Sequence, residues 1–160
     1  MYVDIENAMN EMEPELQLVG AIFRNARIDY AKGCRKIQRN GGLDHLNETY
    51  DKYKNIVSTF DRINNAIDEE NKKIIKNNNK RYTVKQELIP SLPITEEVQT
   101  AKNYIKRYTY ITKEYNEVEA FLRSEWCETL SSLSSLDHTF LVENFHEMRD
   151  EIFNQKLIHI

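Results

Sequence analysis

The chain has 160 residues, with 26 acidic and 22 basic side chains and a formal net charge of −4. This length suits one domain with a core large enough to fold alone. Only 40% of the residues are apolar, and no uncharged stretch approaches the roughly 18 residues of a membrane span, so we expect no membrane partner. The acidic start of the chain lacks the basic and apolar regions of a secretory signal. We therefore expect a cytoplasmic protein, in the host cytoplasm if it is phage-encoded.

Glycine and proline are scarce, with four and three copies in the whole chain, against averages of about 7% and 5%. Folds built on β-sheets need many tight turns, so this composition favours an all-α fold. The two cysteines, Cys34 and Cys127, are far apart and lack metal-type spacing. They are typical of free thiols in a reducing compartment.

The predicted elements begin with a short helix over residues 1–12. A second helix, over 14–40, starts with Pro14 in its first turn and carries apolar residues at steps of three and four from Leu16 to Ile37. Gly41 and Gly42 supply the stop, because glycine readily takes the left-handed conformation that ends helices.

A third helix is predicted over 44–79, where Asn71 interrupts an otherwise apolar stripe. Residues 80–94 are non-helical, since Pro90 and Pro93 keep them extended. Thr95 begins a helix predicted over 95–133, whose apolar stripe runs from Val98 through Trp126 to Leu130. The last helix is predicted over 137–158, with Ser135 or Asp137 as its cap.

The fold class predicted from these elements is all-α: an elongated helical bundle in a single domain, residues 1–160. Its centre is a long antiparallel helical hairpin of 44–79 and 95–133, with flanking N- and C-terminal helices. Two long helices joined by about 15 residues should pack antiparallel, because we expect a connection of this length to be too short to run back along the helices.

Sequence motifs for catalysis are weak. Glu143 and His146 form one E-x-x-H pair, whereas bundle di-metal sites use two such pairs and two further glutamates. Cys34 lies on an apolar stripe and Cys127 beside one, positions typical of unreactive core thiols. The chain has no P-loop, G-x-S-x-G or HExxH motif. We therefore predict no enzyme activity, catalytic residue, metal or cofactor, and keep a bundle enzyme or metal protein as the third hypothesis.

Charge is segregated along the chain. The helix predicted over 14–40 carries a basic face of Arg24, Arg35, Lys36 and Arg39. Residues 114–151 hold ten acidic residues and only two arginines. Residues 72–107 hold nine cations against three acids, and the hairpin would place them at its tip. The predicted partner-binding residues of this basic tip, with two interleaved tyrosines, are Lys72, Lys73, Lys76, Lys80, Arg81, Tyr82, Lys85, Lys102, Lys106, Arg107 and Tyr110.

The leading hypothesis is a non-enzymatic intracellular interaction protein that binds another macromolecule through its charged helical faces. Small, acidic chains rich in Asn, Lys and Ile suit an inhibitor or adaptor of host machinery from a phage or mobile element. A protein is the first expected partner, and the acidic 114–151 strip would suit a mimic of nucleic acid. The alternative is a nucleic-acid-binding protein that uses the basic tip. A second apolar flank at Ile111 and Phe121 is compatible with a homodimer or with burial inside the bundle.

Overall fold

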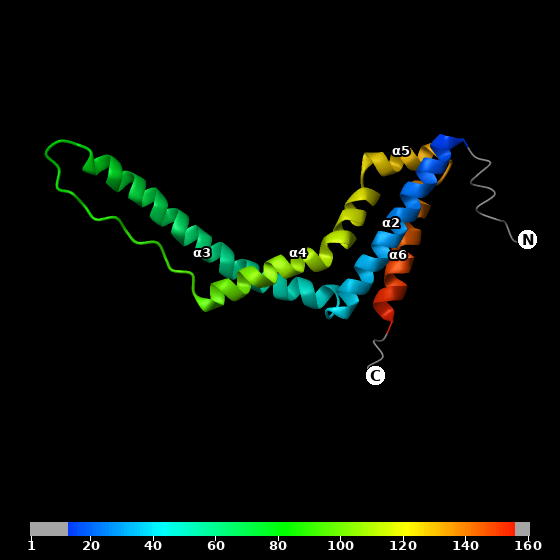
Figure 1. The fold of residues 1–160 in the computed structure, drawn as a ribbon, viewed down its shortest axis with the longest axis horizontal. Helices are drawn as coiled ribbons and strands as arrows, with labels where there is room; N and C mark the ends of the chain where they lie inside the picture. Colours follow the sequence, from blue (N-terminus) through cyan, green and yellow to red (C-terminus); the bar gives the residue numbers. More distant parts are fainter. Residues whose placement is uncertain (1–12, 156–160) are drawn as a thin grey trace, which may run out of the picture. The chain divides into compact units, whose positions relative to one another are not determined.

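The computed structural model describes residues 13–155, which contain five helices and no strands (Figure 1). The all-α fold class is therefore confirmed. The helices are α2 (Pro14–Arg39), α3 (Leu43–Asn78), α4 (Glu96–Leu122), α5 (Glu125–Leu133) and α6 (His138–Asn154). The helix predicted over 1–12 and the end of the helix predicted over 137–158 lie outside the described residues.

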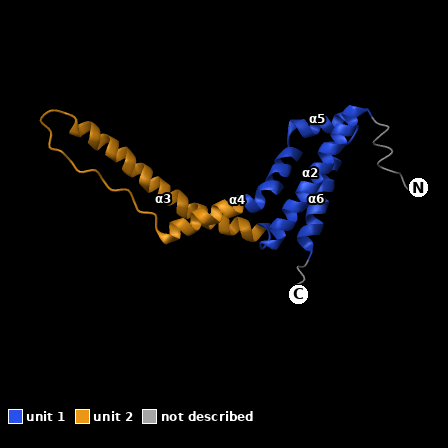
Figure 2. Cartoon of the chain, in the orientation of Figure 1, with its two compact units in different colours: residues 1–43, 110–160 blue, residues 44–109 orange. Residues whose placement is uncertain are grey.

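The chain divides into two compact units (Figure 2). Unit 1 comprises residues 1–43 and 110–160, and unit 2 comprises residues 44–109. Helix α4 contributes its first half to unit 2 and its second half to unit 1.

Unit 1 has an aromatic core between α2, α4 and α6. The fully buried Tyr30 ring stacks on Tyr115 with centroids 5.5 Å apart and meets Phe145 edge-on at 5.6 Å. Gly33, on the same face of α2, lies against the backbone of α4, because a Cβ added there would be 2.7 Å from the Tyr115 nitrogen. The predicted stripe of the 14–40 helix is thus the face that packs.

Several predicted helix ends are confirmed by their caps. Gly41 and Gly42 have φ angles of 104° and 91°, which end α2 in the left-handed region. The Thr95 hydroxyl accepts a hydrogen bond from the Val98 N–H, and the Asp137 carboxylate accepts one from Thr139. These side chains satisfy N–H groups that a helix leaves unpaired in its first turn.

The continuous helix predicted over 95–133 is wrong at one point. Helix α4 ends at Leu122, and the Ser124 hydroxyl accepts a hydrogen bond from the Cys127 N–H to begin α5. The interruption changes the phase of the apolar stripe. Cys127 is therefore buried, whereas Trp126, which the uninterrupted stripe placed in the core, is 57% exposed.

In unit 2, the first half of α4 runs antiparallel to the first half of α3. The Tyr50 ring stacks on Tyr108 with centroids 4.2 Å apart, and Tyr53 meets Tyr104 at 5.0 Å. Farther along α3, residues 83–94 run beside the helix in extended form (Figure 1). The expectation that this connection would not run back along the helices is wrong, since each extended residue spans about twice the length of a helical one.

Candidate functional site

The extended segment, residues 83–94, is held on α3 by three asparagines and is called the strap below. The asparagines, Asn64, Asn71 and Asn78, recur every seven residues and form what we call the asparagine ladder. Each side-chain amide makes two hydrogen bonds to the main chain of one strap residue. The pairs are Asn78 with Gln86, Asn71 with Ile89 and Asn64 with Leu92.

The geometry of each pair is the same. The amide oxygen accepts from the strap N–H at 2.8 Å in all three pairs. The amide nitrogen donates to the carbonyl of the same strap residue, at 2.9 Å for Asn71 and Asn78 and at 3.5 Å for Asn64. One asparagine thus satisfies both polar groups of one strap residue, as a neighbouring β-strand would.

The two periods match in length. Seven helical residues rise about 10.5 Å, and three extended residues span about 10 Å. A helix with asparagine at every seventh position can therefore stay in register with an extended chain at every third residue.

Two prolines favour this register. Pro90 and Pro93 directly follow Ile89 and Leu92, two of the residues bound to the ladder. A residue before proline is pushed toward extended backbone angles. Proline also lacks an N–H, so neither of these positions leaves a donor without an acceptor.

Most aliphatic side chains of the strap face outward. Val84 is 86% exposed, Leu88 53% and Ile94 57%. On α3, Ile74 between the last two ladder positions is only 8% exposed. The strap therefore covers part of α3 and presents an apolar surface of its own, which we call the strap face: Val84, Leu88, Ile89, Leu92 and Ile94.

The turn between α3 and the strap is tight and polar. The Thr83 hydroxyl donates to the Asn77 and Lys80 carbonyls, and the Lys85 ammonium donates to the Asn78 carbonyl. Tyr82 has a φ of 64° and a fully exposed ring. This left-handed conformation costs a non-glycine residue roughly 1–2 kcal/mol.

The predicted basic tip is divided in the structure. Lys72 and Lys73 form ion pairs with Glu69 and Glu70 on their own helix, at 3.0 and 3.8 Å. The other basic-tip residues at the end of α3 and in the turn are exposed: Lys76, Lys80, Arg81 and Tyr82.

The remaining basic-tip residues lie on α4. Lys102 places its ammonium 5.3 Å from the Phe60 ring centroid, at the first half of α3, while Lys106 and Arg107 are exposed. Tyr110 belongs to unit 1. Within unit 2, the structure therefore does not bring Lys102, Lys106 and Arg107 to the end of α3.

The predicted basic face of α2 includes one cation, Lys36, that is bound to other residues of unit 1. Lys36 lies 3.6 Å above the Tyr110 ring, donates to the Tyr110 carbonyl at 2.8 Å and pairs with Glu114 at 3.3 Å. The pKa of Glu114 is lowered by a backbone hydrogen bond and by Lys36. Arg24, Arg35 and Arg39 remain exposed on this face.

A buried carboxylate is the centre of a polar network in unit 1. Glu119 is 7% exposed, accepts a hydrogen bond from the Tyr30 hydroxyl and lies 3.1 Å from His146 Nε2. Arg123 and Arg149 are within 3.6 and 3.7 Å of its oxygens. The pKa of Tyr30 is raised by burial and by its bond to this carboxylate. Such pairing compensates the cost of burying a charge.

This network changes the interpretation of the E-x-x-H pair. His146 faces Glu119 on α4 instead of its own-helix neighbour Glu143, which is exposed. Across residues 13–155, no group of three or more His, Cys, Asp and Glu side chains is arranged to hold a metal ion. Cys34 is fully buried, and burial raises its pKa to about 12, so its thiol is unreactive at neutral pH.

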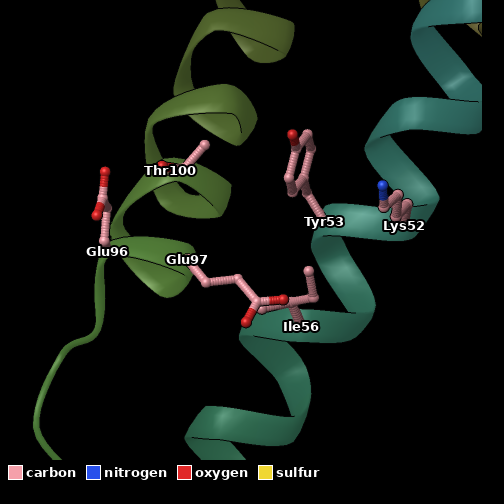
Figure 3. Close-up of a pocket in the computed structure, with 6 residues that line it drawn as sticks. All are labelled: Lys52, Tyr53, Ile56, Glu96, Glu97 and Thr100. Atoms are coloured by element: carbon pink, nitrogen blue, oxygen red, sulfur yellow. The ribbon is translucent and has the colours of Figure 1, made fainter.

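A pocket lies between α3 and the start of α4 in unit 2 (Figure 3). The lining residues are Lys52, Tyr53, Ile56, Glu96, Glu97 and Thr100. Glu97 and Tyr53 point into the gap between the helices (Figure 3). Opposite charges line this pocket, and nothing in it resembles a nucleophile with its base.

Sequence reasoning missed both the asparagine ladder and Glu119. The ladder had a detectable pattern, namely asparagine at every seventh position of α3 followed by prolines three residues apart. Glu119 had none, because the sequence around it is rich in exposed acids.

The second apolar flank is covered within unit 1, where Phe121 meets Phe23 at 6.3 Å and Ile111 is buried.

Compared with known proteins, the chain matches no protein-family model, no curated protein and no solved structure. Among the helices described, none combines the length and the apolar character of a membrane span. The candidate site therefore depends on its geometry alone.

Proposed function

We propose that this is a non-enzymatic interaction protein that binds a protein partner through the strap face of unit 2. The observation that carries the proposal is a main chain held by six hydrogen bonds while its aliphatic side chains point outward. Several exposed apolar side chains within one short segment are typical of sites that bind other proteins. Because the main chain is already ordered, binding there costs less conformational entropy.

The charged faces are weaker candidates than the strap face. Lys36, Lys72 and Lys73 have partners within the chain, and Glu119 is buried. The cations near the turn can still contribute at the rim of an interface, where charge steers association more than it strengthens it.

Site-specific photo-crosslinking tests the proposal. A photoreactive residue would be placed at Leu88 or Ile94, and a control at the exposed Ala120 in unit 1. In a lysate of a low-GC bacterium, we expect adducts to one protein at both strap positions, competed by excess unmodified chain. Adducts that are absent from the strap, or equal at Ala120, would contradict the proposal.

Nucleic-acid binding at the turn is the second candidate function. Lys80, Arg81 and the fully exposed Tyr82 ring combine the charge and stacking surface that single strands bind. Fluorescence anisotropy with labelled DNA and RNA should then show binding that weakens steeply with salt and with the K76E/R81E double variant. No binding at low salt would remove this candidate.

A further inference from the structure

The asparagine ladder recognises only the main chain of the strap. All six of its hydrogen bonds go to the N–H or carbonyl groups of Gln86, Ile89 and Leu92. Every residue except proline carries the same N–H and carbonyl groups. The ladder therefore selects a backbone shape and a three-residue repeat, and leaves the identity of the side chains open.

The strap itself gains little from side-chain burial. Three of its aliphatic side chains are more than half exposed, and its polar residues Lys85 and Glu87 are exposed as well. The turn that leads into it contains Tyr82 in the left-handed region. Segments with few buried apolar contacts open locally at low free-energy cost.

We propose that Asn64, Asn71 and Asn78 form a binding site for an extended, proline-bearing peptide segment, and that the strap is its resident occupant. The partner protein first docks on the strap face, and one of its extended segments then replaces the strap at this site. The inference rests on the proposed function in one respect: the segment that replaces the strap comes from the partner protein. The affinity of the ladder for an extended main chain can be measured without that partner.

The chemistry of the occupant follows from the strap. It needs an N–H and a carbonyl facing the ladder at every third residue, and a proline after at least two of these residues. The prolines hold the preceding residues extended before binding, which reduces the entropy lost on docking. Recognition of such preformed extended segments is a recurring mode of protein–peptide binding.

The test uses an open-ladder variant, in which residues 84–94 are replaced by a glycine–serine linker of equal length. The probe is a fluorescent peptide with the sequence of residues 83–95. We expect the variant to bind this peptide at least about 100-fold more tightly than the native chain, whose tethered strap competes at millimolar effective concentration. Adding N71A to the variant should weaken binding about tenfold or more, because it removes two hydrogen bonds.

Modified peptides distinguish main-chain recognition from ordinary apolar contact. N-methylation at Ile89 removes the N–H that donates a hydrogen bond to Asn71 Oδ1, and should weaken binding at least about tenfold. N-methylation at Leu88 is the matched control and should change binding by less than about threefold. A peptide with alanine at Val84, Leu88 and Ile94 should also bind within about threefold of the parent peptide.

A second measurement uses the native strap, in case the open-ladder variant loses helix content by circular dichroism. A cysteine introduced by S91C carries an environment-sensitive dye, since the native Cys34 and Cys127 are fully buried. Peptide at millimolar concentration should displace the labelled strap and change the dye signal, and the Ile89 N-methyl peptide should not.

The possible outcomes are separable. Peptide binding that is blocked at Ile89 supports the proposal, whether or not photo-crosslinking finds a partner. A helical open-ladder variant that binds no peptide would overturn it and leave the strap face as a fixed docking surface. A labelled strap displaced only by a second copy of the chain, seen as a dimer by light scattering, would also overturn it.

Discussion

Gly33 and Cys34 lie side by side on the face of α2 that packs in unit 1. Gly33 lets the α4 backbone approach, and Cys34 fills the adjacent space with a fully buried thiol. The sequence predicted Cys34 as a core residue, and this is confirmed, because an apolar stripe at helical spacing is directly readable. The close approach of the α4 backbone to Gly33 could not be predicted, because glycine also occurs at positions where no other backbone lies nearby.

Substitution of Gly33 by alanine should therefore destabilise the protein. The new Cβ would lie 2.7 Å from the Tyr115 backbone nitrogen, so α2 and α4 must move apart. We expect a loss of about 1–3 kcal/mol in the free energy of unfolding, measured by urea titration. Gly20→Ala on the same helix is the control and should be neutral or stabilising, since alanine favours helix by up to about 1 kcal/mol. Equal effects at the two sites would contradict the close approach.

The Cys34 thiol predicts a loss of stability at alkaline pH. Its pKa rises from 9.0 to about 12 on folding, so the unfolded state releases the proton first. The stability from this group is complete below pH 9 and is lost between pH 9 and about 12, by up to roughly 1.4 kcal/mol per pH unit.

Urea titrations at pH 8, 9, 10 and 11 measure this effect. The C34A variant should start less stable, because a small cavity forms, and should lose less stability above pH 9 than the native chain. Parallel pH profiles for the two proteins would show that Cys34 does not cause the effect.

At the scale of elements, α3 and the strap show two periodicities in register. The sequence predicts an apolar stripe on α3 that is interrupted at Asn71, and Asn71 is the central position of the ladder. Local patterns predicted the helix and the extended segment separately. Their pairing joins residues 8 to 28 positions apart, so the asparagine and proline repeats are visible within each element, but nothing local shows that the two repeats pair.

Removal of one ladder residue should release the strap without unfolding the helix. In N71A, the N–H and carbonyl of Ile89 lose their partner, and we expect amide hydrogen exchange across residues 86–92 to accelerate about tenfold or more. The control is N65A, at an exposed asparagine of the same helix. Faster exchange in both variants, or in neither, would argue against the ladder as the main restraint.

At the scale of the whole molecule, burial is uneven between the two units. The largest fully buried side chains all belong to unit 1: Tyr30, Cys34, Ile37, Thr112, Leu122, Cys127 and Ser131. Unit 2 is held by tyrosine pairs between α3 and α4 and by the asparagine ladder. Stability within a protein follows buried apolar contact, so the units should differ in their local stability.

Hydrogen exchange measured by mass spectrometry on the native chain checks this difference. We expect amides of α2, α6 and the second half of α4 to exchange most slowly. The strap and the C-terminal half of α3 should exchange first, because their hydrogen bonds are the more exposed to solvent. Uniform protection across α3 and α6 would contradict the assignment of the stable core to unit 1.

Local sequence patterns are enough to predict the all-α class, the approximate bounds of most helices and the buried face of α2. Periodicity, capping residues and the Gly41–Gly42 stop act over a few neighbouring residues, and these are the interactions a sequence displays.

The position of the strap, the burial of Glu119 and the pairing of individual cations are seen only in the tertiary structure. The first two, and the pairing of Lys36, depend on hydrogen bonds or ion pairs between residues far apart in the chain, such as Tyr30 with Glu119 or Lys36 with Glu114. A polar side chain on a helix has the same local sequence signature whether it meets solvent or a distant partner, so only folding assigns it one.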